Sequence, residues 1–183
     1  MGTSCRLRAG SSPGKPRVSD RVTVGFDPGT ARLGFGVLRG EDPVEVIDFG
    51  VLETSSSISM PERLRLLYEG VRDILGRYAP DDCAVERLFF ARNVTTALSV
   101  GQARGVVLLA VAQAGLSVIE YTPAEIKQAV SGWGKADKAQ MQEMVRLLLC
   151  LDEVPYPDDA ADALAVALCH VQTSRFKRAI GGQ

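Results

Sequence analysis

The stretch VTVGFDPGTARLGFGVL, residues 22–38, decides the fold of this chain. An apolar run breaks into a Pro-Gly turn directly after Asp27, and a second apolar run follows at once, which predicts two strands joined by a tight turn. An acid at the tip of a strand, followed by Pro-Gly, lies where the sheet ends and the backbone can approach a ligand closely. Asp27 is therefore the first candidate site residue.

Three strands and then an amphipathic helix are predicted around this stretch. Val, Ile, Phe and Leu alternate with other residues between Gly-rich or charged turns, which predicts strands over residues 21–27, 34–39 and 44–54. Because their connections are short, we expect an antiparallel meander. The period changes to 3.6 residues from Leu64 to Tyr78, and the sequence SMPE at 59–62 fits a capping box that begins this helix.

The second half of the chain alternates helix and strand. A short strand, CAVE, ends on Glu86, and Asn93 can cap a long apolar helix that stops near Gly115. The next strand is LSVIEY (116–121), and TPAE (122–125) is a capping box that begins a helix. SGWGKADK (131–138) breaks this helix. Two further helices follow, over residues 138–150 and DDAADALAVALCHVQ (158–172). This order predicts an α/β fold with one mixed five-stranded sheet flanked by helices.

Composition describes a single soluble globular domain. The 183 residues are 46% hydrophobic and 23% charged, which suits one core of ordinary size. The net charge of -1 gives no overall basic surface, so any surface for nucleic acid has to be local. The four cysteines are far apart and form no Cys-x-x-Cys pair, which indicates reduced thiols and argues against a zinc site or a disulfide framework.

The ends of the chain differ from the middle. Residues 1–20 are rich in Ser, Gly, Pro and basic residues, and they contain no apolar segment that could act as a signal peptide. No stretch approaches the ~20 apolar residues that a membrane span needs. We therefore expect a cytoplasmic protein, with a flexible N-terminal extension over 1–20, one domain over 21–175 and a C-terminal tail over 176–183.

Four carboxylates from three segments are candidates for one site. Glu86 repeats the arrangement of Asp27 at the end of another strand, and Asp159 and Asp162 share one face of a helix. Convergent acids repel one another unless cations neutralise them, and oxygen ligands with open positions suit Mg²⁺ or Mn²⁺. Two such ions can activate a water and stabilise the leaving oxygen of a phosphodiester. The chemistry expected is that of a nuclease.

Each acid also has an ordinary structural explanation. Asp27 can serve as a turn-forming residue, and Asp159 or Asp162 can be an acid favoured at a helix start by the helix dipole. Only their combination favours a site. His170, the only histidine, lies eight residues beyond Asp162, or about 12 Å further along the helix, so we expect it to have a structural or surface role.

Several motifs, in order, closely resemble those of the RuvC family of bacterial Holliday junction resolvases. They span about residues 21–172 and read GFDPGTARLGFGV, VERLFFARNVTTALSVGQARGV, EYTPAEIKQAVSGWGKADKAQMQEMV and DDAADALAVALCH. The resemblance implies a ribonuclease H-like fold, a homodimer, dependence on Mg²⁺ or Mn²⁺, and paired incisions in four-way junction DNA during recombination and repair. It also implies a partnership with the RuvA–RuvB branch-migration complex.

The resemblance assigns roles residue by residue. The metal-binding catalytic acids that it implies, with two metal ions in each site, are Asp27, Glu86, Asp159 and Asp162. Some relatives carry His at the position of Asp159, so Asp here keeps the ligand set entirely carboxylate. The implied DNA contacts are an aromatic residue near the crossover, its polar neighbours and two lysines at the backbone: Phe89, Arg92, Asn93, Lys127 and Lys138. The 20-residue leader is longer than the family usually has.

Two other classes of function remain open from the residues alone. An Asp-x-Gly-Thr turn between hairpin strands also cradles phosphate in actin-like ATPases, although those need two such domains and this chain has room for one. A catalytically silent DNA-binding module of the same fold would not need the carboxylates, and all four are present. Metal-dependent cleavage of a synthetic four-way junction separates the three hypotheses.

Overall fold

The computed structural model describes residues 20–87 and 94–181, with the side chains of 94–96 left out. It contains a five-stranded sheet in the order β3-β2-β1-β4-β5. The strands are β1 Val22–Asp27, β2 Arg32–Arg39, β3 Glu45–Glu53, β4 Asp82–Glu86 and β5 Val118–Tyr121. The first three strands pair antiparallel, whereas β4 pairs parallel with both β1 and β5. The predicted meander and the predicted mixed sheet are both confirmed.

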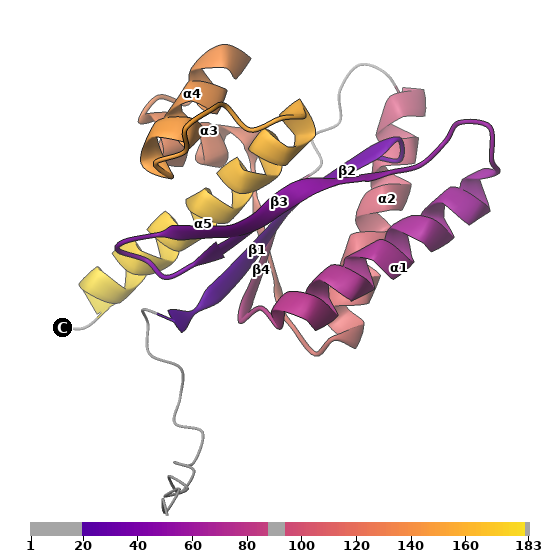
Figure 1. Ribbon diagram of the computed structural model, residues 1–183, viewed down its shortest axis with the longest axis horizontal. Helices are drawn as coiled ribbons and strands as arrows, with labels where there is room; N and C mark the ends of the chain where they lie inside the picture. Colours follow the sequence, from indigo (N-terminus) through magenta and orange to yellow (C-terminus); the bar gives the residue numbers. More distant parts are fainter. Residues whose placement is uncertain (1–19, 88–93, 182–183) are drawn as a thin grey trace, which may run out of the picture.

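Helices cover both faces of the sheet (Figure 1). They are α1 Met60–Tyr78, α2 Val94–Gln113, α3 Pro123–Ser131, α4 Lys138–Leu148 and α5 Asp158–Gly181. One apolar core lies between the sheet and the pair α1–α2, and it includes Val24 and Phe26 of β1. The other lies on the opposite face, where α3, α4 and α5 pack. The period-two alternation of β1 and β2 thus separates two cores.

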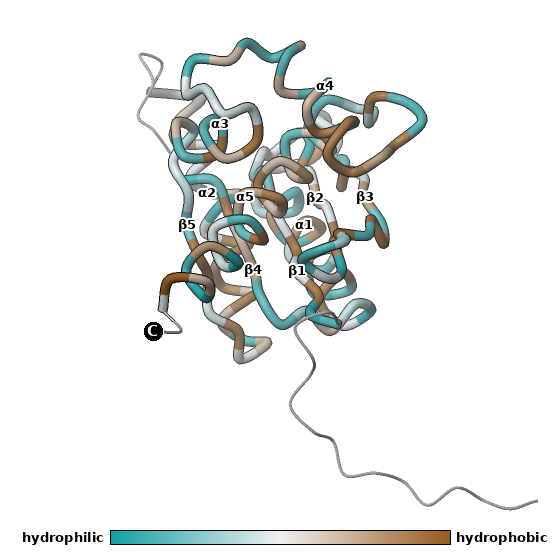
Figure 2. Tube along the Cα trace, turned by 90° about the vertical axis from the view of Figure 1, so that its left-hand side faces the viewer, coloured by the Kyte–Doolittle hydropathy of each residue, from teal (hydrophilic) through white to brown (hydrophobic). Residues whose placement is uncertain are grey.

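Figure 2, seen from the side of the C-terminus, shows how the layers are placed. The paired strands β1 and β4 run side by side through the middle, with α3 and α4 gathered above them at one end of the molecule. The helix α5 continues to Gly181, beyond residue 175, where the sequence analysis places the start of a C-terminal tail. The segment that holds the two α5 acids is therefore the first part of one long helix.

Local capping is predicted correctly at one helix and wrongly at another. At α3, Thr122 and Glu125 form the expected capping box, with both reciprocal bonds present. At α1, Ser59 is the N-cap but its side chain makes no capping bond. The reciprocal half of the box is replaced by another contact, because the Glu62 carboxylate accepts from the guanidinium of Arg65 one turn later. The proposed cap at Asn93 lies outside the described residues.

Candidate active site

Asp27 and Glu86 leave the sheet at the same edge. Asp27 is the last residue of β1 and Glu86 is the last residue of β4, and these two strands are parallel neighbours with Phe26 opposite Val85. Because parallel strands end on the same side, both carboxylates lie at one edge of the sheet. The positions of Asp27 and Glu86 at two strand ends in the sequence predict that they lie close together.

Close packing of α5 on glycine brings the other two acids to this edge. A Cβ on Gly34 would lie 2.0 Å from the carbonyl oxygen of Asp159, and one on Gly25 would lie 2.5 Å from that of Ala163. The helix backbone therefore rests directly on the strands, with no room for an intervening side chain. Gly34 pairs in register with Asp27, so the first turn of α5 comes down beside the end of β1.

The acids influence one another electrostatically. Burial, and then the charges of Glu86, Asp162 and Asp159 in that order, together raise the pKa of Asp27 to about 7, against the opposing charge of Lys138. Burial and then the charge of Asp162 also raise the pKa of Glu86. A carboxylic acid with a pKa near neutrality is a recognised feature of functional sites. All four carboxylates thus share one electrostatic field.

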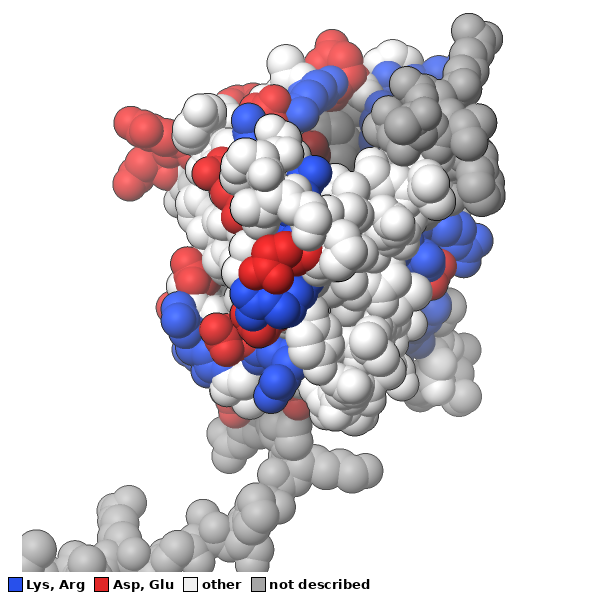
Figure 3. Space-filling model, turned by 90° about the vertical axis from the view of Figure 1, so that its right-hand side faces the viewer, with Lys and Arg blue, Asp and Glu red and all other residues white. Residues whose placement is uncertain are grey.

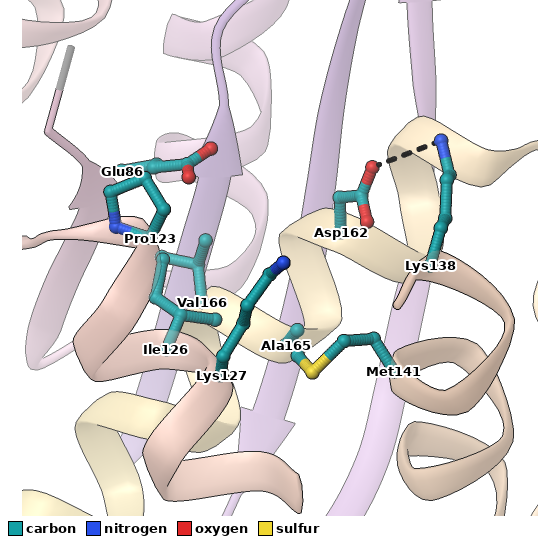
Figure 4. A pocket seen from close by; sticks show the side chains of 9 residues that line it. All are labelled: Glu86, Pro123, Ile126, Lys127, Lys138, Met141, Asp162, Ala165 and Val166. Atoms are coloured by element: carbon teal, nitrogen blue, oxygen red, sulfur yellow. Dashed lines mark ion pairs between the residues drawn. The ribbon is translucent and has the colours of Figure 1, made fainter. Parts of the chain in front are cut away.

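Two of the acids line a cavity together with two lysines (Figure 4). Its volume is about 220 Å³, and its remaining lining comes from α3, α4 and α5: Pro123, Ile126, Met141, Ala165 and Val166. Glu86 and Asp162 face this cavity from opposite sides. Lys127 extends from α3 between them, and Lys138 lies beside Asp162 at the start of α4. The cavity offers carboxylates and ammonium groups to the same ligand.

Basic side chains form ion pairs with the acids of α5. The Lys138 Nζ atom lies 3.0 Å from a carboxylate oxygen of Asp158 and 3.5 Å from one of Asp162. The Nη1 atom of Arg32 lies 3.3 Å from Asp159. Burial raises the pKa of Asp162, and the charge of Lys138 acts in the opposite direction. These cations offset part of the repulsion among the carboxylates.

A family model described as "Crossover junction endodeoxyribonuclease RuvC" matches residues 23–170, which contain all four acids and both lysines. The chain belongs to the RuvC family. The RuvC of Roseiflexus sp. (strain RS-1) is 57% identical over 159 residues, covering 86% of this chain and 95% of that protein. The RuvC of Thermomicrobium roseum is 55% identical over 152 residues, covering 83% and 93%.

Solved structures agree with this membership. A structure titled "T. thermophilus RuvC in complex with Holliday junction substrate" superposes with a TM-score of 0.81 at 39% identity, covering 85% of this chain and 96% of that one. The yeast mitochondrial resolvase Ydc2, at 16% identity and a TM-score of 0.61, shares the fold alone. The ribonuclease H-like fold and the endonuclease class that the motifs predict are thereby confirmed.

The donor set suits a hard metal ion, but it is not drawn together as a ligand cluster. Carboxylate oxygens are the ligands that Mg²⁺ and Mn²⁺ prefer. Among residues 20–87 and 94–181, no three His, Cys, Asp or Glu side chains gather closely enough to hold a metal. The set fits a metal in the chemistry of its donors.

The remaining residues that the sequence analysis discusses for the site lie partly inside and partly outside the residues that the structure describes. Phe89, Arg92 and Asn93 lie outside the described residues. His170 is buried in α5, where its Nδ1 atom lies 3.0 Å from the Tyr121 hydroxyl and its Nε2 atom 3.1 Å from that of Ser174. It therefore packs within the fold and does not face the acids, in agreement with the structural role expected for it.

The sequence places Arg87 and Arg104 among the basic residues near the motifs, but it does not predict that both pair with Glu120. Arg104 of α2 forms a half-buried ion pair with Glu120 of β5, and the Nε atom of Arg87 lies 3.5 Å from the same carboxylate. Arg87 directly follows Glu86, and its N–H donates to the Tyr121 carbonyl at 2.7 Å. One feature of the sequence could have indicated this pair: Arg104 is the one charged residue in the otherwise uncharged sequence of α2.

Proposed function

We propose that this chain resolves four-way DNA junctions by hydrolysing one phosphodiester in each of two strands of like polarity. The family consists of metal-dependent nucleases. The observation that carries the proposal for this chain is the group of four carboxylates at one edge of the sheet, where burial, and then repulsion from Glu86, Asp162 and Asp159, raise the pKa of Asp27 to about 7. Metal binding would relieve that repulsion, and a phosphate would meet the lysines of the same cavity.

The proposed ligands are Asp27, Glu86, Asp159 and Asp162, and we propose Mg²⁺ or Mn²⁺ as the ions, two in each site. Bound ions of this kind supply an activated water and a stabilised leaving oxygen. The chain itself holds the carboxylates on two strand ends and one helix, so their spacing depends on how α5 packs on the sheet. Rigid elements of this kind suit a site that needs fixed ligand positions.

Lys127 and Lys138 are the proposed phosphate contacts. Both line the cavity, and an ammonium group binds a phosphate oxygen as a point charge without reading bases. Lys138 already pairs with Asp158 and Asp162, so a phosphate would compete with these carboxylates for it. Phe89, Arg92 and Asn93 remain proposed DNA contacts by resemblance, and the RuvA–RuvB complex remains a partner proposed on the same ground.

Two incisions in one junction are most simply made by two copies related by a two-fold axis. Figure 3 shows that the surface over α2 is a broad area with neither basic nor acidic side chains. Leu98 and Leu109 of this helix are 65% and 52% exposed. An apolar patch of this kind often marks an interface. We therefore propose a homodimer formed through α2 or its neighbours.

The proposed reaction takes place in the bacterial cytoplasm. The relatives named above are bacterial proteins. Among the described helices, none has the length and apolar character needed to cross a membrane. Cys83, Cys150 and Cys169 are free thiols, a state that reducing compartments maintain. These observations support the proposed location.

The test is cleavage of a synthetic four-way junction, with duplex of the same arm sequence as the reference substrate. We expect Mg²⁺-dependent, symmetric nicks that are lost in Asp27→Asn and Glu86→Gln, while junction binding in EDTA is retained. Asp73→Asn changes an exposed acid on α1 and is the matched control. Cleavage by Asp27→Asn at the wild-type rate would remove that residue from the site. Full activity of a species that sediments as a monomer would disprove the dimer.

A further inference from the structure

An exposed tryptophan stands in the loop between α3 and α4. Trp133 is 56% exposed, although indole is among the side chains that gain most from leaving water. The loop connects the helix that carries Lys127 to the helix that begins at Lys138, and both lysines line the cavity of the candidate active site. Lys135, in the same loop, is also exposed.

Side chains of α3 hold the backbone around Trp133 in place. The Oγ atom of Ser131 lies 2.9 Å from the Trp133 carbonyl oxygen and accepts from the Trp133 N–H at 3.2 Å. The amide of Gln128 donates to the Gly132 carbonyl at 2.9 Å, and the Ala136 N–H donates to the Trp133 carbonyl at 3.1 Å. The indole is therefore carried on an ordered turn, so a ligand that contacts it has little backbone to immobilise.

The combination of an exposed flat aromatic with flanking ammonium groups is typical of surfaces that bind unpaired nucleic acid. In such surfaces the cations follow the phosphates while bases stack on aromatic rings, without regard to sequence. An exposed aromatic farther along α5, Phe176, lacks this setting. Phe176, which is 65% exposed, lies fourteen residues beyond Asp162 on α5, about 21 Å further along the helix.

We propose that Trp133 binds DNA by stacking its indole on an unpaired base of the strand that enters the cavity. This inference rests on the proposed function, because it takes junction DNA as the occupant of the site. Lys127 and Lys138 then neutralise the neighbouring phosphates, and the stacked base fixes how far the strand extends past the carboxylates. The contact adds affinity at the opened crossover and adds none on closed duplex, where the bases are already stacked.

The chain contains one tryptophan, so its intrinsic emission reports on this residue alone. Wild-type protein in EDTA is titrated with a four-way junction, a duplex and a single-stranded oligonucleotide, while anisotropy of labelled DNA measures binding independently. We expect the junction and the single strand to quench Trp133 and to shield it from acrylamide, and the duplex to do neither. Binding without any change in emission or in acrylamide access would overturn the inference.

Variants give the second measurement. Trp133→Ala should weaken junction binding about five-fold or more, Trp133→Phe should restore most of the loss, and Phe176→Ala should bind as wild type. Circular dichroism and the unchanged duplex affinity report that Trp133→Ala remains folded. Equal junction affinities of Trp133→Ala and wild type would disprove the stacking contact while leaving the proposed function intact. Failure of the wild type to bind any of the three DNAs would overturn both.

Discussion

Gly34 on β2 lies against the backbone of Asp159, so closely that a Cβ on Gly34 would stand 2.0 Å from the Asp159 carbonyl oxygen. Gly34 is also the register partner of Asp27 across the β1–β2 pair. Gly34 is therefore the glycine that lets the first turn of α5 come close to the end of β1, while Gly25 and Gly36 allow close packing farther along the helix. The distance between two of the candidate metal ligands depends on the absence of a single methyl group.

Replacing Gly34 with Ala should move the start of α5 away from the sheet. Because the added carbon meets backbone, which cannot rotate aside, we expect a loss of about 1–3 kcal/mol in the free energy of unfolding. Cleavage of a four-way junction should fall at least about ten-fold, since small displacements of catalytic groups are costly. Urea unfolding and single-turnover cleavage measure the two effects.

A helical glycine with open space around it is the control for this substitution. A Cβ on Gly76 of α1 would meet no atom within 4 Å. Gly76→Ala should therefore leave cleavage unchanged and should raise stability by about 0.5–1 kcal/mol, because alanine is the better helix former. If both glycine variants behaved alike, close packing at Gly34 would not control the site.

The raised pKa of Asp27 predicts how stability depends on pH. In the unfolded chain this acid titrates near its ordinary value of 3.8, whereas in the folded protein the pKa is about 7. Between these values the folded state binds more protons, so the contribution of Asp27 to stability falls as pH rises from about 4 to 7. In EDTA at pH 8, Asp27→Asn should therefore be more stable than wild type, by on the order of 2–4 kcal/mol.

Mg²⁺ should reverse the order of stability of the wild type and Asp27→Asn. Addition of Mg²⁺ at pH 8 is expected to raise the melting temperature of the wild type and to have a smaller effect on Asp27→Asn, because a bound ligand stabilises the folded state. Thermal unfolding over pH 4–8, with and without Mg²⁺, measures both. A wild type that is more stable than Asp27→Asn at pH 8 in EDTA would contradict the raised pKa of Asp27.

The local patterns of the sequence predict the elements because their causes are local. Alternation in residues 22–38 predicts two strands and the turn after Asp27, and the structure has them at Val22–Asp27 and Arg32–Arg39. The capping box at Thr122 is confirmed, because Thr122 and Glu125 form both of its reciprocal bonds. The box predicted at Ser59 is wrong: the Ser59 side chain makes no capping bond, and the Glu62 carboxylate pairs with Arg65.

Contacts between distant segments are what the sequence does not predict. Arg32 and Asp159 form an ion pair across 127 positions, and no local period brings them together. The glycine pattern of β2 is visible in the sequence, but its purpose appears only when α5 is seen resting on Gly34. The family resemblance predicts which acids matter, whereas only the packing of α5 explains why they lie at one edge of the sheet.

The ion pair between Arg104 and Glu120 should contribute to stability as a unit. Both side chains are largely removed from water, and the Nε atom of Arg104 is buried without a hydrogen-bond partner. Glu120→Gln leaves the half-buried Arg104 without its carboxylate, and Arg104→Gln leaves Glu120 with the longer contact to Arg87 alone, so each change should cost about 1–3 kcal/mol. The double variant should cost less than the sum of the two, as urea unfolding in a double-mutant cycle measures.

An exposed pair on α1 provides the reference for this cycle. Arg65 and Glu69 are each about half exposed, and their coupling should be about 0.3–0.5 kcal/mol. Because β5 lies next to β4, with Tyr121 opposite Glu86, we also expect Glu120→Gln to reduce cleavage while Glu69→Gln does not. Additive effects of the Arg104 and Glu120 substitutions would show that the pair contributes no coupling.

His170 should make the protein less stable in mild acid. Burial lowers its pKa below the ordinary value of 6.5, against the opposing charge of Asp82, while Arg21 and Lys177 add to the lowering. The unfolded chain therefore takes up this proton first, and stability is lost as pH falls through about 6.5 toward the lower pKa of the folded state. Asp27 acts in the opposite direction over part of this range, so the comparison has to be made between matched proteins.

The variant His170→Gln is the protein to compare with the wild type. Glutamine can hydrogen-bond to the Tyr121 hydroxyl, which lies 3.0 Å from the His170 ring, but it does not titrate. We expect the variant to be less stable than wild type at pH 8, because buried packing is altered, and the difference to shrink as pH falls from 7.5 to 5. Since the chain has one histidine, any difference in slope between the two proteins belongs to this residue. Parallel stability curves for the wild type and His170→Gln, measured by urea unfolding at each pH, would mean that burial does not lower the pKa of His170.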